Sequence, residues 1–498
     1  MTAADALFDH FGRIAAVSNA IGILQWDSDA MMPEGAAATR AESMAALSVI
    51  RHDLLTDPRL AEWLSAAQTA PAAGLWEQAN LREIARILAV ETAVPADLVA
   101  ASSRAVSACE MQWRTARAAA DFAMLRPALE EVLRLQREIG AAKGARLGVC
   151  PYDALLNDYE PGARSQRIDA LFDDLGAFLP GFMDEVAVVQ ARRPQEAALS
   201  GPFATATQCS LGLEIMTAMG FDFSRGRLDI SAHPFCGGAD NDVRITTRYD
   251  ENDFLGALLG IVHETGHALY EQGRPQRWIH QPVGQARGMS VHESQSLLME
   301  MQVFRSRAGT AFLAPKLRAA FGRTGGGWSA DALWRRFTRV QPGFIRIEAD
   351  EVTYPAHIIL RYRLEKALIG GDLSLADLPG AWNEGMRELL GIVPPDDRFG
   401  CLQDIHWPSG GWGYFPTYTL GAMTAAQMFD AACRAEPEIL PGVAKGDFAP
   451  LTGWLHTHVH SLGSLYETDM LLTRATGRPL DAVVYKAHLR RRYIEEAV

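Results

Sequence analysis

Apolar residues recur at three- and four-residue steps along most of this chain, which is the period of an amphipathic helix. The pattern runs through residues 2–70, interrupted at 32–35, and continues in long segments rich in Ala, Leu, Arg and Glu over 75–147. These residue types favour helix. A further helix is expected over 164–191, more helices are expected over 330–370, and helices return over 422–498. The pattern therefore predicts a mainly α protein, with the basic segment RRRYIEEAV at 490–498 as a surface tail.

One segment departs from the helical period. Residues 221–250 place β-branched residues in short runs between turn residues, and DVRITTRY at 242–249 alternates apolar and polar positions as a strand does. We expect strands at about 226–231 and 242–249, paired as a small antiparallel sheet. Because an apolar helical segment follows at 254–272, the sheet is expected beside that helix, where an edge strand can bind an extended peptide.

Composition and charge narrow the class of protein. No Gly/Ser linker, low-complexity tract or charge run divides the 498 residues, so we expect one domain over 1–498 although length alone favours about three. The net charge of −13 argues against a nucleic-acid partner. No apolar run is long enough to cross a bilayer, and the acidic N-terminus lacks the basic region of a signal peptide. With six cysteines outside any CxxC spacing, these features predict a cytoplasmic protein with free thiols and no membrane partner.

The chemistry is expected to centre on residues 254–272, FLGALLGIVHETGHALYEQ. His263 and His267 are four residues apart, which places them on one face of a helix where both can ligate one metal ion. Glu264 lies next to the first ligand and can accept a proton from a metal-activated water. H-E-x-x-H is the zinc-peptidase motif, although the bare pattern also fits an amphipathic helix with two satisfied histidines. The apolar residues on both sides favour the metal site, because buried imidazoles need partners.

A third ligand is expected from residues 289–306, MSVHESQSLLMEMQVFRS. Glu293 would complete the two-histidine, one-carboxylate set of an open catalytic zinc site. Ser290 and Glu293 also fit a capping box, in which Glu293 only closes the start of a helix. Ligand imidazoles generally donate their second nitrogen to an acceptor. Asp350, in a largely buried helix expected within 330–370, is the predicted acceptor.

Residues 396–421 are rich in glycine and aromatic residues and read as a long irregular loop that enters a helix. Loops of this length in a compact chain tend to be functional. Gln403 and His406 supply donors and acceptors there, and a tyrosine hydroxyl near the metal can stabilise an oxyanion. Chemistry alone leaves Tyr414 and Tyr418 equally open, and aromatic packing is the alternative for both. His233, in the loop between the predicted strands, is a candidate substrate contact or a structural histidine.

Beyond these single residues, the sequence resembles the carboxypeptidase Taq family of zinc metallocarboxypeptidases. The matching blocks follow the family's order, span nearly the full chain and show no departure at a motif position. They are WDSDAMMP at 26–33, HPF at 233–235, DVRIT at 242–246, HETGH at 263–267, HESQ at 292–295, IRIEAD at 345–350, GCLQDIHW at 400–407 and GYFPTYTLG at 413–421.

The resemblance implies a nearly all-helical, saddle- or clamshell-like body with a deep central groove, usually a homodimer. It implies removal of single residues from peptide C-termini with broad specificity and poor action next to proline. The cofactor would be Zn²⁺, with Co²⁺ a possible substitute. The implied ligands are His263, His267 and Glu293, with Glu264 as general base, and the family context favours Tyr418 over Tyr414 as oxyanion donor.

By similarity, Arg244, Arg346, and Gln403 with His406 would close the end of the groove and hold the substrate C-terminus. The chemistry agrees, because arginine binds a free carboxylate with two parallel hydrogen bonds. Two other interpretations remain. One is a zinc oligopeptidase or dipeptidyl carboxypeptidase with an open groove. The other is a helical binding protein with a catalytically vestigial site.

Overall fold

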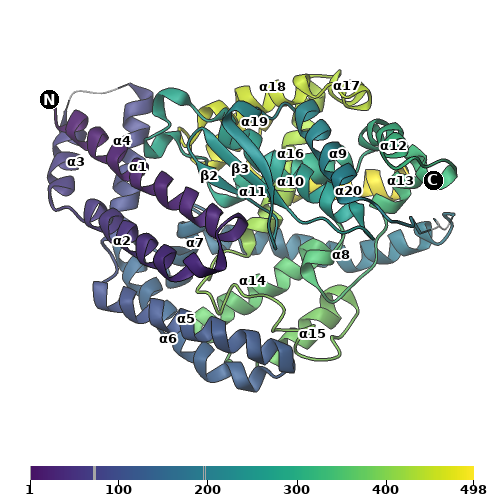
Figure 1. Cartoon of the computed structure of the whole chain (residues 1–498). Helices are drawn as coiled ribbons and strands as arrows, with labels where there is room; N and C mark the ends of the chain where they lie inside the picture. Colours follow the sequence, from purple (N-terminus) through teal and green to yellow (C-terminus); the bar gives the residue numbers. More distant parts are fainter. Residues whose placement is uncertain (1, 71–73, 195, 197, 498) are drawn as a thin grey trace.

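The computed structural model describes residues 2–70, 74–194, 196 and 198–497. Helices dominate it, as the apolar pattern predicts (Figure 1). Twenty α-helices lie within these residues: α1 (Ala3–Ala30), α2 (Ala37–Leu55), α3 (Arg59–Thr69), α4 (Leu75–Glu91), α5 (Ala96–Ala119), α6 (Phe122–Leu147), α7 (Pro151–Tyr159), α8 (Ser165–Gln190), α9 (Thr205–Met219), α10 (Phe254–Gly273), α11 (Met289–Leu297), α12 (Arg307–Phe321), α13 (Ala330–Phe337), α14 (Tyr354–Gly370), α15 (Leu378–Leu390), α16 (Pro416–Ala435), α17 (Ile439–Lys445), α18 (Ala449–His458), α19 (Thr468–Thr476) and α20 (Ala482–Arg490). Two π-helices, Leu298–Phe304 and Arg491–Glu495, continue α11 and α20.

The apolar core has one large part and smaller satellites. The large cluster extends from α5 to the π-helix after α20 and includes the buried faces of α8, α10, α11, α14 and α16. A satellite cluster lies beneath α1, α3 and α4, whose purple and blue ribbons occupy the left of Figure 1. The helix expected over 164–191 is α8, and its bounds confirm the prediction within one residue. No helix in the described part of the chain is long and apolar enough to cross a membrane.

A single three-stranded sheet lies within the described residues, formed by β1 (Gly226–Ile230), β2 (Phe235–Ala239) and β3 (Asp242–Thr247). The strand order is β1-β3-β2, so β3 is central. Its alternation places Val243 and Ile245 against α9 and α10. Arg244 points to the other face, where its guanidinium lies 4.2 Å from the ring centroid of Trp26 in α1. The sheet is therefore held between α10 and the N-terminal helix.

The expected antiparallel pairing of the strands near 226–231 and 242–249 is wrong. Those two strands run parallel, and it is β2 that pairs antiparallel with β3. Strand β2, of sequence FCGGA, lacks the β-branched residues that predict a strand. Asp240 and Asn241 join it to β3 as a two-residue turn, with Asn241 at φ 58°, a left-handed conformation that asparagine tolerates. The sheet therefore contains one strand that was not predicted, β2, and β1 runs parallel to β3 where an antiparallel direction was expected.

Helix α10 carries the H-E-x-x-H residues, and local sequence explains its start and its packing. The Asp253 side chain accepts a hydrogen bond from the backbone N–H of Leu255 and caps the first turn. Most of the helix is buried. At Gly266 an added Cβ would lie 2.4 Å from the carbonyl oxygen of Gln295. The absence of a side chain there lets the backbones of α10 and α11 approach closely.

The chain near its last described residues is anchored in the interior by two buried side chains, so the prediction of a surface tail is wrong. Tyr493 is fully buried and Arg492 nearly so. The Tyr493 hydroxyl and the Arg492 guanidinium donate to Glu351 Oε2 at 2.9 and 2.8 Å. His488 Nε2 lies 2.8 Å from Oε1 of the same carboxylate. These contacts offset the cost of burying Glu351 and attach α20 and its π-helix to the segment just before α14.

A second buried carboxylate organises the glycine- and aromatic-rich segment. Glu365 in α14 is fully buried. It accepts hydrogen bonds from the Tyr152 hydroxyl (2.7 Å), the Trp407 indole N–H (2.8 Å) and the backbone N–H of Gly413 (2.8 Å). Burial raises the pKa of Glu365 to about 7, against the effect of its three donors. Glu365 thus holds two positions of this loop in place, Gly413 and Trp407, the residue after His406.

Replacing Glu365 with glutamine should lower the free energy of unfolding by about 1–3 kcal/mol. The amide has one acceptor oxygen, so its NH₂ group would face one of the three donors and leave it unsatisfied in the interior. Chemical denaturation monitored by circular dichroism measures the loss. Glu388→Gln on the exposed side of α15 is the control and should change stability by less than about 0.5 kcal/mol. Equal effects of the two substitutions would contradict the proposed role of Glu365.

Candidate metal centre

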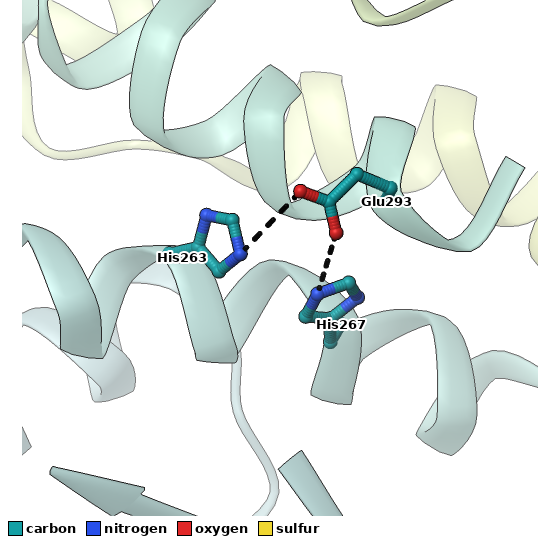
Figure 2. Close-up of side chains that lie close together, drawn as sticks. All are labelled: His263, His267 and Glu293. Carbon is teal, nitrogen blue, oxygen red and sulfur yellow. Dashed lines mark ion pairs between the residues drawn. The ribbon is translucent and has the colours of Figure 1, made fainter. Parts of the chain in front are cut away.

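The structure brings His263, His267 and Glu293 together (Figure 2). The two imidazoles project from successive turns of α10 and the carboxylate from α11. His263 Nε2 lies 3.9 Å from Glu293 Oε1, and His267 Nε2 lies 3.4 Å from Oε2. All three ligand atoms fall within 4.8 Å of one another. Glu293 makes no capping box, because the backbone N–H of Ser290 donates to Glu160.

The hydrogen bonds of His263 leave its Nε2 free for a metal. Its Nδ1 lies 2.9 Å from Glu300 Oε2. An ionised carboxylate only accepts, so Nδ1 carries the proton of the neutral imidazole and Nε2 keeps its lone pair. Glu300 is held in turn by Arg305, at 2.5 Å. Glu300 therefore fixes the orientation and the tautomer of this ring.

A chain of two hydrogen bonds fixes the orientation and the tautomer of the His267 ring. His292 Nε2 lies 2.8 Å from Glu271 Oε1, and His292 Nδ1 lies 2.7 Å from His267 Nδ1. Because the Glu271 carboxylate accepts, His292 donates through Nε2, and its bare Nδ1 accepts from His267 Nδ1–H. His267 Nε2 then has a free lone pair aimed at Glu293. Two imidazole nitrogens and one carboxylate thus form a donor set that suits a divalent cation such as zinc.

The prediction that Asp350 holds a ligand imidazole is wrong. Its carboxylate accepts from three backbone N–H groups, those of Gln341, Val352 and Thr353, at 2.9–3.0 Å. Short acidic side chains often bond their own neighbouring backbone in this way. The residue that fills the predicted role is Glu300. Its position seven residues after Glu293, on the same helical face, is a signal that sequence inspection could have used.

Removing the Glu300 carboxylate should weaken metal binding about 10- to 100-fold, the usual cost of losing a partner of a ligand imidazole. Asp350→Ala is the matched control, since it also removes a carboxylate that receives hydrogen bonds. Competition with a chromophoric chelator measures both affinities on the metal-depleted chains. If Asp350→Ala lowers the affinity as much as Glu300→Ala, the assignment of Glu300 is incorrect.

Glu264 lies beside the ligands without being one of them. It is 8% exposed. In the chain without a cation, burial raises the pKa of Glu264 to about 7, with His263 opposing the shift and Glu293 adding to it. A carboxylate with a pKa near neutrality can accept a proton and return it. The structure therefore places a suitable base next to the ligand cluster.

Arg346 belongs to a short 3₁₀ turn, Arg346–Glu348, and not to a long buried helix as predicted. Its Nε and Nη2 donate to Asp404 Oδ1 at 3.0 and 2.9 Å, and Nη1 lies 3.4 Å from the Tyr354 hydroxyl. Asp404 also accepts from Arg361 Nε at 2.6 Å. Two guanidinium groups thus share one carboxylate and leave one positive charge in excess. Arg361 is fully buried, so Arg346 is the one of the pair that can meet a ligand.

Gln403 and Arg244, which were also predicted to hold the substrate C-terminus, form hydrogen bonds within the protein. The Gln403 amide oxygen accepts from the backbone N–H of Arg346 at 2.9 Å, and its NH₂ group donates to the Phe344 carbonyl at 3.1 Å. Gln403 therefore positions Arg346. Arg244 donates to Asp242 Oδ1 and Oδ2 at 3.0 and 2.6 Å, so its charge is already balanced. His233 lies exposed between β1 and β2, and its contact with substrate stays a prediction.

The aromatic residues of the loop and of α16 lie around Arg346. The Arg346 guanidinium is 4.9 Å from the Tyr418 ring centroid, and the Tyr418 hydroxyl lies 3.4 Å from His406 Nε2. Tyr414 contacts the edge of Tyr418, with ring centroids 5.2 Å apart. Burial raises the pKa of Tyr418 to about 12, so its hydroxyl is a neutral donor. Burial lowers the pKa of His406 to about 4, so its imidazole is neutral as well.

Comparison with known proteins agrees with this site. The model of the carboxypeptidase Taq (M32) metallopeptidase family matches residues 6–493. The chain belongs to this family and is a metallocarboxypeptidase, which confirms the resemblance drawn from the motifs.

Individual relatives match over almost their full length. Thermostable carboxypeptidase 1 of Thermus thermophilus is 38% identical over 496 residues, which cover 97% of each chain. Carboxypeptidase 1 of Bacillus subtilis is 33% identical over 496 residues, covering 98% of this chain and 97% of its own. The structure of Trypanosoma cruzi metallocarboxypeptidase 1 aligns with a TM-score of 0.97 at 39% identity, over 99% of both chains.

Proposed function

We propose that this protein is a zinc-dependent exopeptidase that releases single amino acids from peptide C-termini with broad specificity. The observation that carries the proposal is the pair of free Nε2 atoms directed at Glu293, since both Nδ1 atoms are engaged by hydrogen-bond partners. Two imidazoles and one carboxylate with an open position suit Zn²⁺, and Co²⁺ is expected to substitute. The sequence resemblance favours a homodimer, and the six free cysteines favour the cytoplasm.

When bound, the cation polarises the scissile carbonyl and increases the acidity of water beside it. Glu264 accepts a proton from the attacking water and returns it to the leaving amine. The Tyr418 hydroxyl donates to the oxygen that gains negative charge, and His406 orients that hydroxyl. Tyr414 packs against Tyr418 and lines the substrate site with it. The roles of the two tyrosines and His406 rest on their contacts with one another and with Arg346.

Arg346 is proposed to bind the free carboxylate of the substrate. The excess positive charge of the Arg346–Asp404–Arg361 cluster and the burial of its guanidinium groups support this role. Arg244 and His233, on the sheet side, stay predicted substrate contacts, and the ion pair of Arg244 with Asp242 makes Arg346 the stronger candidate for the carboxylate. The single catalytic domain over 1–498 is supported by the large apolar cluster that continues from Cys109 to Tyr493.

Digestion of an N-terminally blocked peptide, followed by mass spectrometry, tests the proposal. We expect a series of products that lose one residue at a time from the C-terminus. A chelator should abolish the series and added Zn²⁺ should restore it. An internal cut or a loss of two residues at a time would favour the oligopeptidase or dipeptidyl carboxypeptidase interpretation. Stoichiometric metal without activity on any peptide would favour a vestigial binding protein.

A further inference from the structure

Glu271, one helical turn after His267 on α10, accepts hydrogen bonds through both of its carboxylate oxygens. Its Oε1 lies 2.8 Å from His292 Nε2, in the chain of hydrogen bonds that ends at His267. Its Oε2 lies 2.7 Å from Nε of Arg274, the residue that follows α10. An ionised carboxylate accepts at both oxygens, so it suits two donors at once. Glu271 therefore connects the ligand network to an arginine at the end of the helix.

Arg274 is fixed in place by its other contacts. It is 4% exposed. Its Nη1 donates to Gln285 Oε1 and its Nη2 donates to Asp240 Oδ1, both at 2.7 Å. Asp240 is held in turn by Asn19 of α1, whose side-chain amide donates to Oδ2 at 3.0 Å. Because the guanidinium is rigid and its three nitrogens bond three different segments, Arg274 cannot turn its Nε–H away from Glu271 without losing these bonds.

The direction of donation along this chain decides whether His267 can bind a metal. As long as residue 271 accepts, His292 donates through Nε2 and accepts through Nδ1, and His267 Nε2 keeps its lone pair. If residue 271 donated instead, each bond would reverse, and His292 would donate through Nδ1. The proton of His267 would then lie on Nε2, the atom 3.4 Å from Glu293 Oε2. A protonated Nε2 has no lone pair for a cation.

We propose that Arg274 is a positioning residue of the metal centre, which sets the direction of proton donation along the chain from Glu271 to His267. Its Nε–H can only donate, so the atom of residue 271 that faces it must be an acceptor. With glutamate, a second acceptor oxygen remains for His292. With glutamine, the single oxygen would face Arg274 and the NH₂ group would face His292. This inference rests on the proposed zinc site and adds a residue that is not among its ligands.

The proposal predicts the order of two substitutions. Glu271→Gln presents a donor to His292, so the reversed chain is fully bonded without metal and must turn back before a cation binds. Glu271→Ala removes the acceptor but imposes no direction on His292. We expect the affinity for Zn²⁺ to fall about ten-fold for Glu271→Ala and about 100-fold for Glu271→Gln, within the usual range for a partner of a ligand imidazole. A merely structural role of Glu271 gives the opposite order, because alanine also leaves a cavity.

Competition with a chromophoric chelator measures the affinity for Zn²⁺ on metal-depleted chains, so hydrolysis is not the readout. Adding Arg274→Met to Glu271→Gln lets the amide turn its oxygen to His292, and the affinity should rise about ten-fold above that of Glu271→Gln alone. Glu251→Gln makes the same change at an exposed position before α10 and should bind as wild type does. The melting temperature of each metal-free chain reports folding, and Asp240→Asn is added if the loss of Arg274 destabilises the chain.

Weaker binding by Glu271→Gln than by Glu271→Ala, restored in part by Arg274→Met, supports the proposal. The opposite order of the first two variants, or no gain from Arg274→Met, overturns the role of Arg274 and leaves the zinc site in place. Failure of the wild-type chain to bind Zn²⁺ would overturn the proposed zinc site, and the role of Arg274 with it.

Discussion

Glu264→Gln is expected to lower kcat by about 10²- to 10⁴-fold, the usual contribution of a positioned general base. The amide keeps the shape of the side chain but cannot take a proton from water. Metal content should not change, because the three ligand atoms come from His263, His267 and Glu293. Steady-state hydrolysis of a blocked peptide and metal analysis of the same preparation give the two readouts.

Glu251→Gln, an exposed change shortly before α10, serves as the control and should retain the wild-type rate. A Glu264→Gln chain that turns over peptides normally would exclude this residue as the base. Loss of metal together with activity would instead indicate that Glu264 holds the ligand geometry. The paired measurement therefore distinguishes a proton-transfer role from a structural one.

The second large effect is expected for Arg346→Ala, which should lower kcat/KM about 10²- to 10³-fold for peptides with a free C-terminal carboxylate. Truncating one partner of a buried charge pair costs about 2–5 kcal/mol. Asp404 keeps its bond to Arg361, so the change should not leave a buried carboxylate unpaired. The loss should occur mainly in KM, as expected for a residue that binds substrate equally in the ground and transition states.

A C-terminally amidated peptide provides the internal comparison, since it lacks the group that Arg346 is proposed to bind. Its hydrolysis should be slow with wild type and should not fall further with Arg346→Ala. Arg244→Ala is the competing variant, and the ion pair of Arg244 with Asp242 predicts a smaller effect. A large loss for Arg244→Ala and none for Arg346→Ala would reverse the two assignments.

The parts of the site that could be predicted from sequence are those fixed by local geometry. His263 and His267 are brought together by one turn of helix, so their spacing alone defines the pair. The alternation of DVRIT likewise predicts that Val243 and Ile245 are buried while Arg244 faces the other side, and both hold in the structure. In both cases the residues that form the sequence pattern also form the local structure, so no distant contact is needed for the prediction.

The wrong predictions for Asp350 and for the segment after α20 come from contacts between residues that are far apart in the sequence. An acidic residue in a segment expected to be buried does not reveal its partner, and Asp350 bonds its own backbone neighbourhood while Glu300 holds His263. The basic segment after α20 was expected on the surface because of its charge. Arg492 is buried because Glu351, 141 residues earlier, supplies its counter-charge. Charge alone predicts exposure only where no such partner exists.

The glycines around the ligands have a consequence for anyone who wishes to transplant this centre. Gly266 lets α10 lie against α11, and at Gly421 an added Cβ would come within 2.9 Å of the Glu293 side chain. A designed bundle that copied only the histidines and the glutamate, with alanine at these two positions, would push its helices apart and spread the ligands. A copy of the metal centre therefore also needs glycine at positions 266 and 421, although neither residue is a metal ligand.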